Sequence, residues 1–477
     1  MCGCLGSRTA PARADSRSTV TVVQTADNLS QRLATMPDES FTLKPPSHVP
    51  VIAVNARLRY QTIKGVGGAL TDSSAWLIGE KLASNKRSSL LHNLFAANAG
   101  GLNFVRLPMG ASDFTATGIP YSYDDLPARQ TDPTLTHFSV VHDVPYIIPT
   151  LREIMEIDPA ANTLAEPWSP PPWMKANDRF DDRAFSGTLL PTDWPVLANY
   201  FVKFLQAYAS QGVPIQAVTP ENEPRAAASY PSMSFPEASE LQWAMQDLLP
   251  ALKAAHLPVH VYGGDVSFAA PGYGIEVASG AAKAGLYGVA QHCYHGIPYL
   301  LNKLHSTDAA LDLLVSECAV ELTPYSASEI VIGAMRNWAS TVALWNLALD
   351  PQGGPVQAPN RGCAPCKGIV TINPQTHAVT YNLAYYQLAQ FGRFVKPGAQ
   401  RIDSNHLVSY FITKKSGQYG ATAGVDDIAF RNPDHSLVLL AYNNSTSAAK
   451  FAVSWARHFF TYQLPAHATV TFDWNYA

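Results

Sequence analysis

Residues 214–224 read PIQAVTPENEP, and residues 311–317 read LDLLVSE. Each segment begins as a short apolar run, typical of a strand, and ends on acidic side chains: Glu221 and Glu223 in the first, Glu317 in the second. In a parallel β/α barrel the side chains at the C-terminal ends of the strands face the mouth of the barrel. The two segments therefore indicate both a fold and a place for chemistry.

Strand-like runs alternate with amphipathic segments on both sides of these two stretches. We expect eight strands, at residues 62–67, 103–108, 163–168, 214–219, 259–263, 288–292, 311–316 and 341–346. Eight β-then-α alternations over roughly 285 residues predict a (β/α)8 TIM barrel in the α/β class. A doubly wound open sheet is the alternative, but residues 65–68 (GVGG) lack the G-x-G-x-x-G spacing of a phosphate loop.

The pattern changes after about residue 395, where short strands are separated by turn residues. Residues 20–54 also have the pattern of strands, so we expect N- and C-terminal strands to pair in a β-sandwich attached to the barrel. The predicted domains are a signal-like N-terminus (1–18), N-terminal sandwich strands (19–58), the catalytic barrel (59–394) and the rest of the sandwich (395–477).

Composition narrows the range of partners. Charged residues are 15% of the 477 and the net charge is −4, with no basic patch, which argues against a nucleic acid or an anionic membrane as partner. No apolar run is long enough to span a bilayer. Residues 12–14 (ARA) resemble the end of a signal peptide, although no apolar segment precedes them. We therefore expect an exported protein, secreted or periplasmic.

Cysteine spacing leaves several possibilities. Cys363 and Cys366 form C-x-x-C in a Gly/Pro-rich loop, for which a loop-closing disulfide is favoured over a redox motif. A zinc site would need two more ligands at suitable spacing, and none is near. Cys293 and Cys318 are interpreted as buried free thiols. No metal and no organic cofactor are predicted.

A pair of carboxyl groups at one barrel mouth suits glycoside cleavage. One group protonates the leaving oxygen, and the other attacks the anomeric carbon or activates water. Strands four and seven face each other across the mouth, so Glu223 and Glu317 could flank one scissile bond. The alternative is that either glutamate forms a structural ion pair at the barrel rim.

Six short motifs, in order along the chain, resemble those of glycoside hydrolase family 30 in clan A, the glucosylceramidase-like group. The resemblance covers nearly the whole chain. The motifs are GVGGALTD (65–72), NFVRLPM with SDF (103–109, 112–114), WSPPPWMK (168–175), ENEP (221–224), SE (316–317) and WNLAL (345–349).

The resemblance implies a role for each matching position. Glu223 would be the general acid/base and Glu317 the nucleophile of a retaining β-glycosidase, which makes Glu221 structural. Further contacts to the sugar or to the nucleophile are implied for Arg106, Asp113, Trp168, Asn222, His292, Tyr294 and Trp345. Among these, Arg106 would lie beneath Glu317 and keep it ionised, and Asn222 would bind the sugar 2-hydroxyl.

Two features bear on the substrate. Glu166 stands where relatives carry a small hydroxylated residue, so its carboxylate could be exposed at the rim or could reshape the sugar pocket. The loop with Cys363 and Cys366 is similar to that of β-1,6-glucanase-type members. We predict hydrolysis of a β-glucan or β-gluco-oligosaccharide. The alternatives are a glucosylceramidase acting on a glycolipid, a β-xylosidase or β-fucosidase, or a carbohydrate-binding protein without activity.

Overall fold

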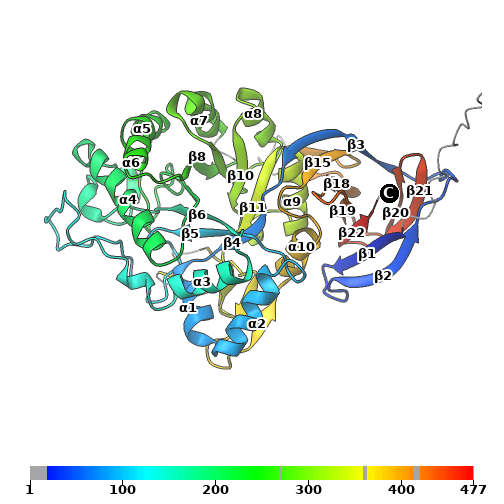
Figure 1. Cartoon of the computed structure of the whole chain (residues 1–477), viewed down its shortest axis with the longest axis horizontal. Coiled ribbons are helices and arrows are strands. Elements are labelled where there is room, and N and C mark those ends of the chain that lie inside the picture. The colour runs from blue at the N-terminus through cyan, green and yellow to red at the C-terminus, as the bar shows by residue number, and fades with distance from the viewer. Residues whose placement is uncertain (1–18, 269–270, 358–362, 413–418, 476–477) are drawn as a thin grey trace, which may run out of the picture.

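The protein has two parts, a barrel ringed by helices and a β-rich domain beside it (Figure 1). The computed structural model describes residues 19–268, 271–357, 363–412 and 419–475. The predicted signal-like segment 1–18 lies outside the described residues.

Eight parallel strands close into a ring in the order β10-β11-β4-β5-β6-β7-β8-β9. In the order of the sequence, these strands are β4 (Gly65–Ala69), β5 (Phe104–Pro108), β6 (Asn162–Glu166), β7 (Ala217–Val218), β8 (His260–Ser267), β9 (Gly288–His292), β10 (Asp312–Glu317) and β11 (Ala339–Leu344). Nearly every residue of these strands is buried, as expected when helices cover the outer face of a parallel sheet. The predicted TIM barrel is confirmed.

Helices follow each barrel strand. They are α1 (Asp72–Lys81), α2 (Ser84–Phe95), α3 (Ile147–Ile157), α4 (Trp194–Ser210), α5 (Glu237–Trp243), α6 (Leu249–Ala254), α7 (Pro271–Ala284), α8 (Leu300–Thr307), α9 (Ala327–Arg336) and α10 (Leu383–Gly392). Local sequence fixes several of their starts. Thr71 accepts from the Ser74 amide at the first turn of α1, and Ser326 with Glu329 forms a capping box on α9.

The barrel interior is layered. One apolar layer fills it and consists of Phe104, Leu164, Ala217, Tyr262, Ala290, Leu314 and Ala343. Alternate residues of a strand face the same side, so the residues two positions later point into the barrel one layer nearer the mouth. That next layer is polar and includes Arg106, Glu166, Thr219, His292 and Ser316. The chemistry of the site is built on it.

The second domain contains one sheet of nine strands in the order β2-β1-β22-β19-β18-β15-β3-β20-β21. They are β1 (Thr19–Ala26), β2 (Ala34–Ser40), β3 (Val51–Thr62), β15 (Gln400–Ser404), β18 (Val425–Arg431), β19 (Leu437–Asn443), β20 (Ala449–Trp455), β21 (His458–Leu464) and β22 (Ala468–Trp474). The sheet folds back on itself, since Phe460 of β21 contacts Phe472 of β22 across the core, with ring centroids 5.1 Å apart. This is the predicted sandwich of N- and C-terminal strands. β3 continues past residue 58 to Thr62, and the predicted domain boundaries remain predictions.

Smaller elements complete the described chain. β12 (Ala348–Leu349), β13 (Val370–Ile372) and β14 (Val379–Tyr381) form a small sheet after the last barrel strand, and β16 (Tyr410–Ile412) pairs with β17 (Tyr419–Ala421). The two domains contact each other through α9 and α10. Arg336 of α9 donates to the carbonyl of Asp427, and Thr471 donates to the carbonyl of Gln390 in α10.

Candidate active site

A cavity of about 420 Å³ opens at the C-terminal end of the barrel. Its walls include six of the residues predicted for the site: Asp113, Trp168, Glu223, Tyr294, Glu317 and Trp345. The other three, Arg106, Asn222 and His292, are buried and hydrogen-bond to one another or to the glutamates. Residues that the sequence did not indicate also line the cavity, among them Tyr230, Ser267 and His295.

Glu317 is the last residue of β10 and is held by side chains from two other strand ends. Arg106 Nη1 donates to its Oε2 at 2.5 Å, and the Tyr294 hydroxyl donates to its Oε1 at 2.8 Å. The Tyr294 oxygen in turn accepts from the Ala319 amide at 3.1 Å. Both oxygens of Glu317 therefore have a fixed donor, and only 4% of the side chain is exposed.

Glu223 follows β7 and faces the same cavity. Its backbone has φ +46°, in the left-handed region that few non-glycine residues adopt, and its amide donates to the Asp265 carbonyl at 3.0 Å. The side chain is 22% exposed, far more than that of Glu317. Water and a leaving group can therefore reach Glu223 more easily than they can reach Glu317.

Arg106 and His292 connect the two glutamates beneath the cavity. Arg106 Nη2 donates to Asn222 Oδ1 at 2.7 Å and to Asp265 Oδ2 at 2.9 Å. His292 Nδ1 lies 3.2 Å from Glu223 Oε1 and 3.6 Å from Glu317 Oε1, while its Nε2 lies 3.1 Å from Asp265 Oδ1. Two cationic side chains and the carboxylates around them form one buried network.

The charges in this network shift each other's pKa values. Burial alone would lower the pKa of His292, but the carboxylates of Glu317 and Asp265 outweigh it and raise the pKa to about 10. Burial would raise the pKa of Asp265, but Arg106 and His292 hold it below its usual value. At neutral pH His292 is therefore a cation and Asp265 an anion.

Aromatic rings form one wall of the cavity. Trp168 and Trp345 are stacked with ring centroids 5.2 Å apart and an interplanar angle of 21°, and Tyr230 packs against Trp168 at 5.4 Å. Such faces suit the apolar C–H patches of a sugar ring.

Asp113 contributes an acceptor beside these rings. Its Oδ2 accepts from the Cys363 amide at 3.3 Å, whereas its buried Oδ1 has no protein hydrogen-bond partner among the described residues. Burial, and then the nearby charge of Glu317, raise the pKa of Asp113 well above its usual value. A sugar hydroxyl in the cavity would satisfy the unpaired oxygen.

Glu166 is not exposed at the rim, which was one of the two expectations for it. It is neither exposed at the rim nor part of the cavity wall, because its side chain is fully buried beneath the site with Oε1 3.4 Å from Arg106 Nε. The strand alternation explains this: Glu166 points inward, like Leu164, and lies in the layer below the cavity. Glu221 is buried as well and outside the cavity wall.

The prediction for two cysteines is wrong. Cys293 and Cys318 are joined in a disulfide and are not free thiols. Each directly follows the end of a strand, and β9 and β10 are neighbours with His292 paired to Glu317, so the two sulfur atoms meet. The disulfide thus ties the strand end of His292 to that of Glu317. Cys363 and Cys366 are also bonded to each other, and Cys363 lines the cavity.

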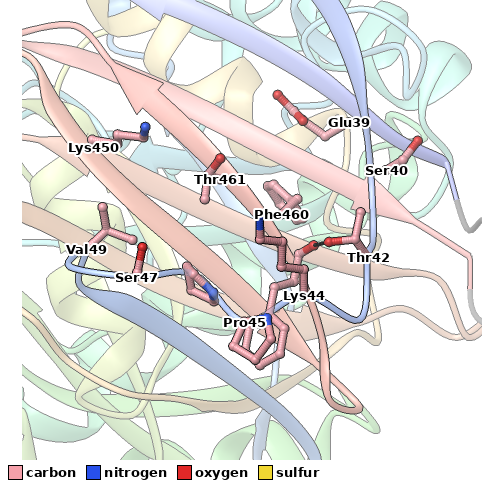
Figure 2. A pocket seen from close by; sticks show the side chains of 12 residues that line it. Glu39, Ser40, Thr42, Lys44, Pro45, Ser47, Val49, Lys450, Phe460 and Thr461 are labelled. Carbon is pink, nitrogen blue, oxygen red and sulfur yellow. Dashed lines mark hydrogen bonds between the residues drawn. The ribbon is translucent and has the colours of Figure 1, made fainter.

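Two further features of the described residues differ from this site. A cavity of about 390 Å³ at the edge of the sandwich is lined by Lys44, Lys450 and Phe460 among others, with Glu39 as its one carboxylate (Figure 2). Within the described residues, Asp124, Asp132 and His137 could together hold a metal ion, but none of them lines the cavity with the glutamates. Asp132 there accepts from the Thr136 hydroxyl and the His137 amide, which organises its own loop.

Comparison with known proteins agrees with this geometry. The pattern of the glycosyl hydrolase family 30 TIM-barrel domain matches residues 63–395, and that of the family 30 beta sandwich domain matches residues 398–472. The chain belongs to glycosyl hydrolase family 30. This family 30 chain is therefore a glycoside hydrolase, and its substrate is a carbohydrate. The resemblance inferred from the six motifs is confirmed.

Relatives of this family 30 chain include hydrolases with different named substrates. It is 33% identical to the endo-1,6-beta-D-glucanase of Neurospora crassa over 399 residues, which cover 81% of this chain and 79% of that protein. It is 28% identical to the lysosomal acid glucosylceramidase of Mus musculus, over 85% of this chain and 79% of that one. A solved endo-beta1,6-glucanase superposes with a TM-score of 0.80 at 26% identity, covering 96% of this chain and all of that one.

Among the residues that the structure describes, no helix is both long and apolar enough to cross a bilayer.

Proposed function

We propose that this family 30 chain cleaves β-linked glucans, with β-1,6-glucan as the preferred substrate, by a retaining two-glutamate mechanism. Glu317 is the nucleophile and Glu223 the general acid/base. The observation that carries the proposal is that both side chains line one cavity and share one partner, His292. Similarity to endo-1,6-beta-D-glucanases supports the choice of glucan.

The separation of the two carboxyl groups favours retention of configuration. Because one nitrogen of His292 lies 3.2 Å from Glu223 and 3.6 Å from Glu317, the two facing oxygens are at most about 7 Å apart, the sum of those distances. Retaining enzymes hold the carboxyl groups roughly 5–5.5 Å apart, and inverting ones roughly 6.5–9.5 Å. Most separations up to this limit are shorter than those of inverting enzymes.

In the first step Glu317 attacks the anomeric carbon while Glu223 gives its proton to the departing oxygen. The buried, doubly hydrogen-bonded Glu317 is oriented for attack by Arg106 and Tyr294. In the second step Glu223 takes a proton from water, which attacks the same carbon and releases the sugar with its β configuration.

His292 stays next to the negative charge during the first step. The charge begins on Glu317, disappears there when the ester forms, and appears on Glu223 once its proton has left. The His292 cation faces both carboxylates through the same nitrogen. It can therefore stabilise the charge at either end without moving, which limits the reorganisation that the reaction requires.

We also propose a cellular location for the protein. Two disulfides close to the active site persist most readily in an oxidising compartment, so we propose that the protein is exported.

The test compares wild type with Glu317→Ala on β-1,6-glucan (pustulan), β-1,3-glucan (laminarin), an aryl β-glucoside and glucosylceramide. We expect pustulan to be hydrolysed fastest, with β-configured product in the first NMR spectra, and the variant to lose at least about 10³-fold in kcat. Azide should rescue Glu317→Ala on the aryl glucoside and yield an α-glucosyl azide.

The matched control is Glu221→Gln, a buried glutamate of the same motif outside the cavity wall. It should retain activity within about threefold. Faster hydrolysis of glucosylceramide than of any glucan would contradict the proposed substrate. Equal activity of Glu317→Ala and wild type would contradict the mechanism.

A further inference from the structure

Glu166 is a buried acid for which the proposed mechanism has no use. It is the last residue of β6, next to β5, and its carbonyl accepts from the Met109 amide at 2.7 Å. Leu164, two residues earlier, belongs to the apolar layer, and Phe104 holds the same relation to Arg106 on the neighbouring strand. Glu166 and Arg106 are therefore neighbours in the polar layer directly below the sugar cavity.

The contact between them concerns one particular nitrogen. Nη1 and Nη2 of Arg106 donate to Glu317, Asn222 and Asp265 on one side. Nε, on the other side, has Glu166 Oε1 at 3.4 Å, and in the described part of the chain neither Nε nor the two Glu166 oxygens have a hydrogen-bond partner. Glu166 thus faces the one nitrogen of the guanidinium that the rest of the network leaves unpaired.

The charges around Glu166 show in which form it makes this contact. Arg106 and His292 are balanced by the carboxylates of Asp265 and Glu317, so a third anion would be in excess in this buried layer. Burial raises the pKa of Glu166 well above its usual value, Arg106 opposes this, and Asp265 and Glu317 add to it. Burial and the two neighbouring carboxylates thus favour the protonated form of Glu166, in which an uncharged carboxyl group faces Arg106 Nε.

We propose that Glu166 is a positioning residue, whose carboxyl group holds the Arg106 guanidinium in the orientation that reaches Glu317. This rests on the proposed function, in which Glu317 is the nucleophile. An acceptor at Nε prevents the guanidinium from rotating away from Glu317, and an uncharged acceptor leaves the charge of the network unchanged. The essential feature is thus an oxygen acceptor at this position and not a negative charge.

Three substitutions of Glu166 test whether its oxygen acceptor, its acidic group or its size matters for activity. Glu166→Leu removes the acceptor but keeps an inward side chain, and Glu166→Thr is a shorter substitute should the leucine variant not fold. Either should lower kcat about tenfold with KM within about twofold, since the oxygen that faces buried Arg106 Nε at 3.4 Å is lost but no sugar contact.

Glu166→Gln keeps an oxygen acceptor of the same reach without the acid. It should retain kcat within about threefold of wild type. The matched control is Thr341→Val, which replaces another buried, unpartnered group inside the barrel and should leave kcat unchanged. Thermal unfolding of every variant checks the fold.

Each outcome is decisive. Full activity of Glu166→Leu and Glu166→Thr would overturn the inference, and so would a glutamine variant as slow as the leucine variant or a threefold or greater loss in Thr341→Val. An inactive wild type on every β-glucoside would instead contradict the proposed function.

Discussion

Two successive layers inside the barrel come from the same strands but have opposite chemistry. The lower layer takes Phe104, Leu164 and Leu314 from β5, β6 and β10, and is apolar. Two residues later on the same strands come Arg106 and Glu166, which are fully buried as well but ionisable. A step of two residues along a strand thus separates the part of the interior that stabilises the fold from the part that supports the reaction in the proposed mechanism.

The two layers are stable for different reasons. The apolar layer gains free energy because each side chain leaves water. The polar layer pays a desolvation penalty for every charge, and offsets it only by pairing Arg106 and His292 with Asp265 and Glu317. Removing one member of the polar layer should therefore disturb all the others, whereas a truncation in the apolar layer should act locally.

The largest expected effect comes from Arg106→Met. The variant leaves Asp265 and Glu317 buried without their shared cation and removes the donor at 2.5 Å from Glu317. We expect kcat/KM to fall about 10³-fold or more, which corresponds to about 4 kcal/mol of transition-state stabilisation. Initial rates on the aryl β-glucoside would measure it.

The matched control is Phe104→Leu, two residues earlier and in the apolar layer. It should unfold at a lower temperature but keep kcat/KM within about threefold. If Arg106→Met remained within tenfold of wild type, the polar layer would not support the reaction and the comparison would fail.

An intermediate effect is expected from Leu314→Ala, in the apolar layer beneath the end of β10. The cavity left by the leucine should lower the free energy of unfolding by about 2–5 kcal/mol, measured by urea denaturation. The folded fraction should keep its kcat within about twofold, because the polar layer lies between this position and the sugar. A kcat loss as large as that of Arg106→Met would show that the two layers are not separable.

The fold could be predicted from the sequence because eight apolar runs alternate with helical patterns. The spacing of apolar residues indicates directly which side chains are buried. The signal is not equally strong everywhere. The sequence of α7, PGYGIEVASGAAKA, is rich in glycine and alanine and has little periodic contrast. In the sandwich, β21 alternates only weakly between buried and exposed residues.

In the site, strand-end position located Glu223 and Glu317 but not Asp265. The predicted strand stopped at Gly263, whereas β8 continues to Ser267, so the same rule applied to the true strand end would have found it. The disulfide between Cys293 and Cys318 depended on which strands are neighbours in space. The depth of Glu166 in the barrel could not be predicted, because a departure from a motif shows that a side chain differs, but not which layer it occupies.

The last prediction concerns stability and not rate, and is a pH dependence of unfolding that belongs to His292. Its folded pKa of about 10 lies above the value of about 6.5 usual for an unfolded chain. A raised pKa means that the folded state binds the proton more tightly, so the stabilisation is fully present below about pH 6.5 and is lost as the pH rises towards 10. The free energy of unfolding of wild type should fall across this window more steeply than that of His292→Asn, with exposed His256→Asn as the control.

Because the apolar layer has no proton to lose, Leu314→Ala should reduce stability equally at both ends of the window. Parallel curves for wild type and His292→Asn would mean that His292 is neutral in the folded protein, and the balance of two cations against two anions in the polar layer would no longer hold.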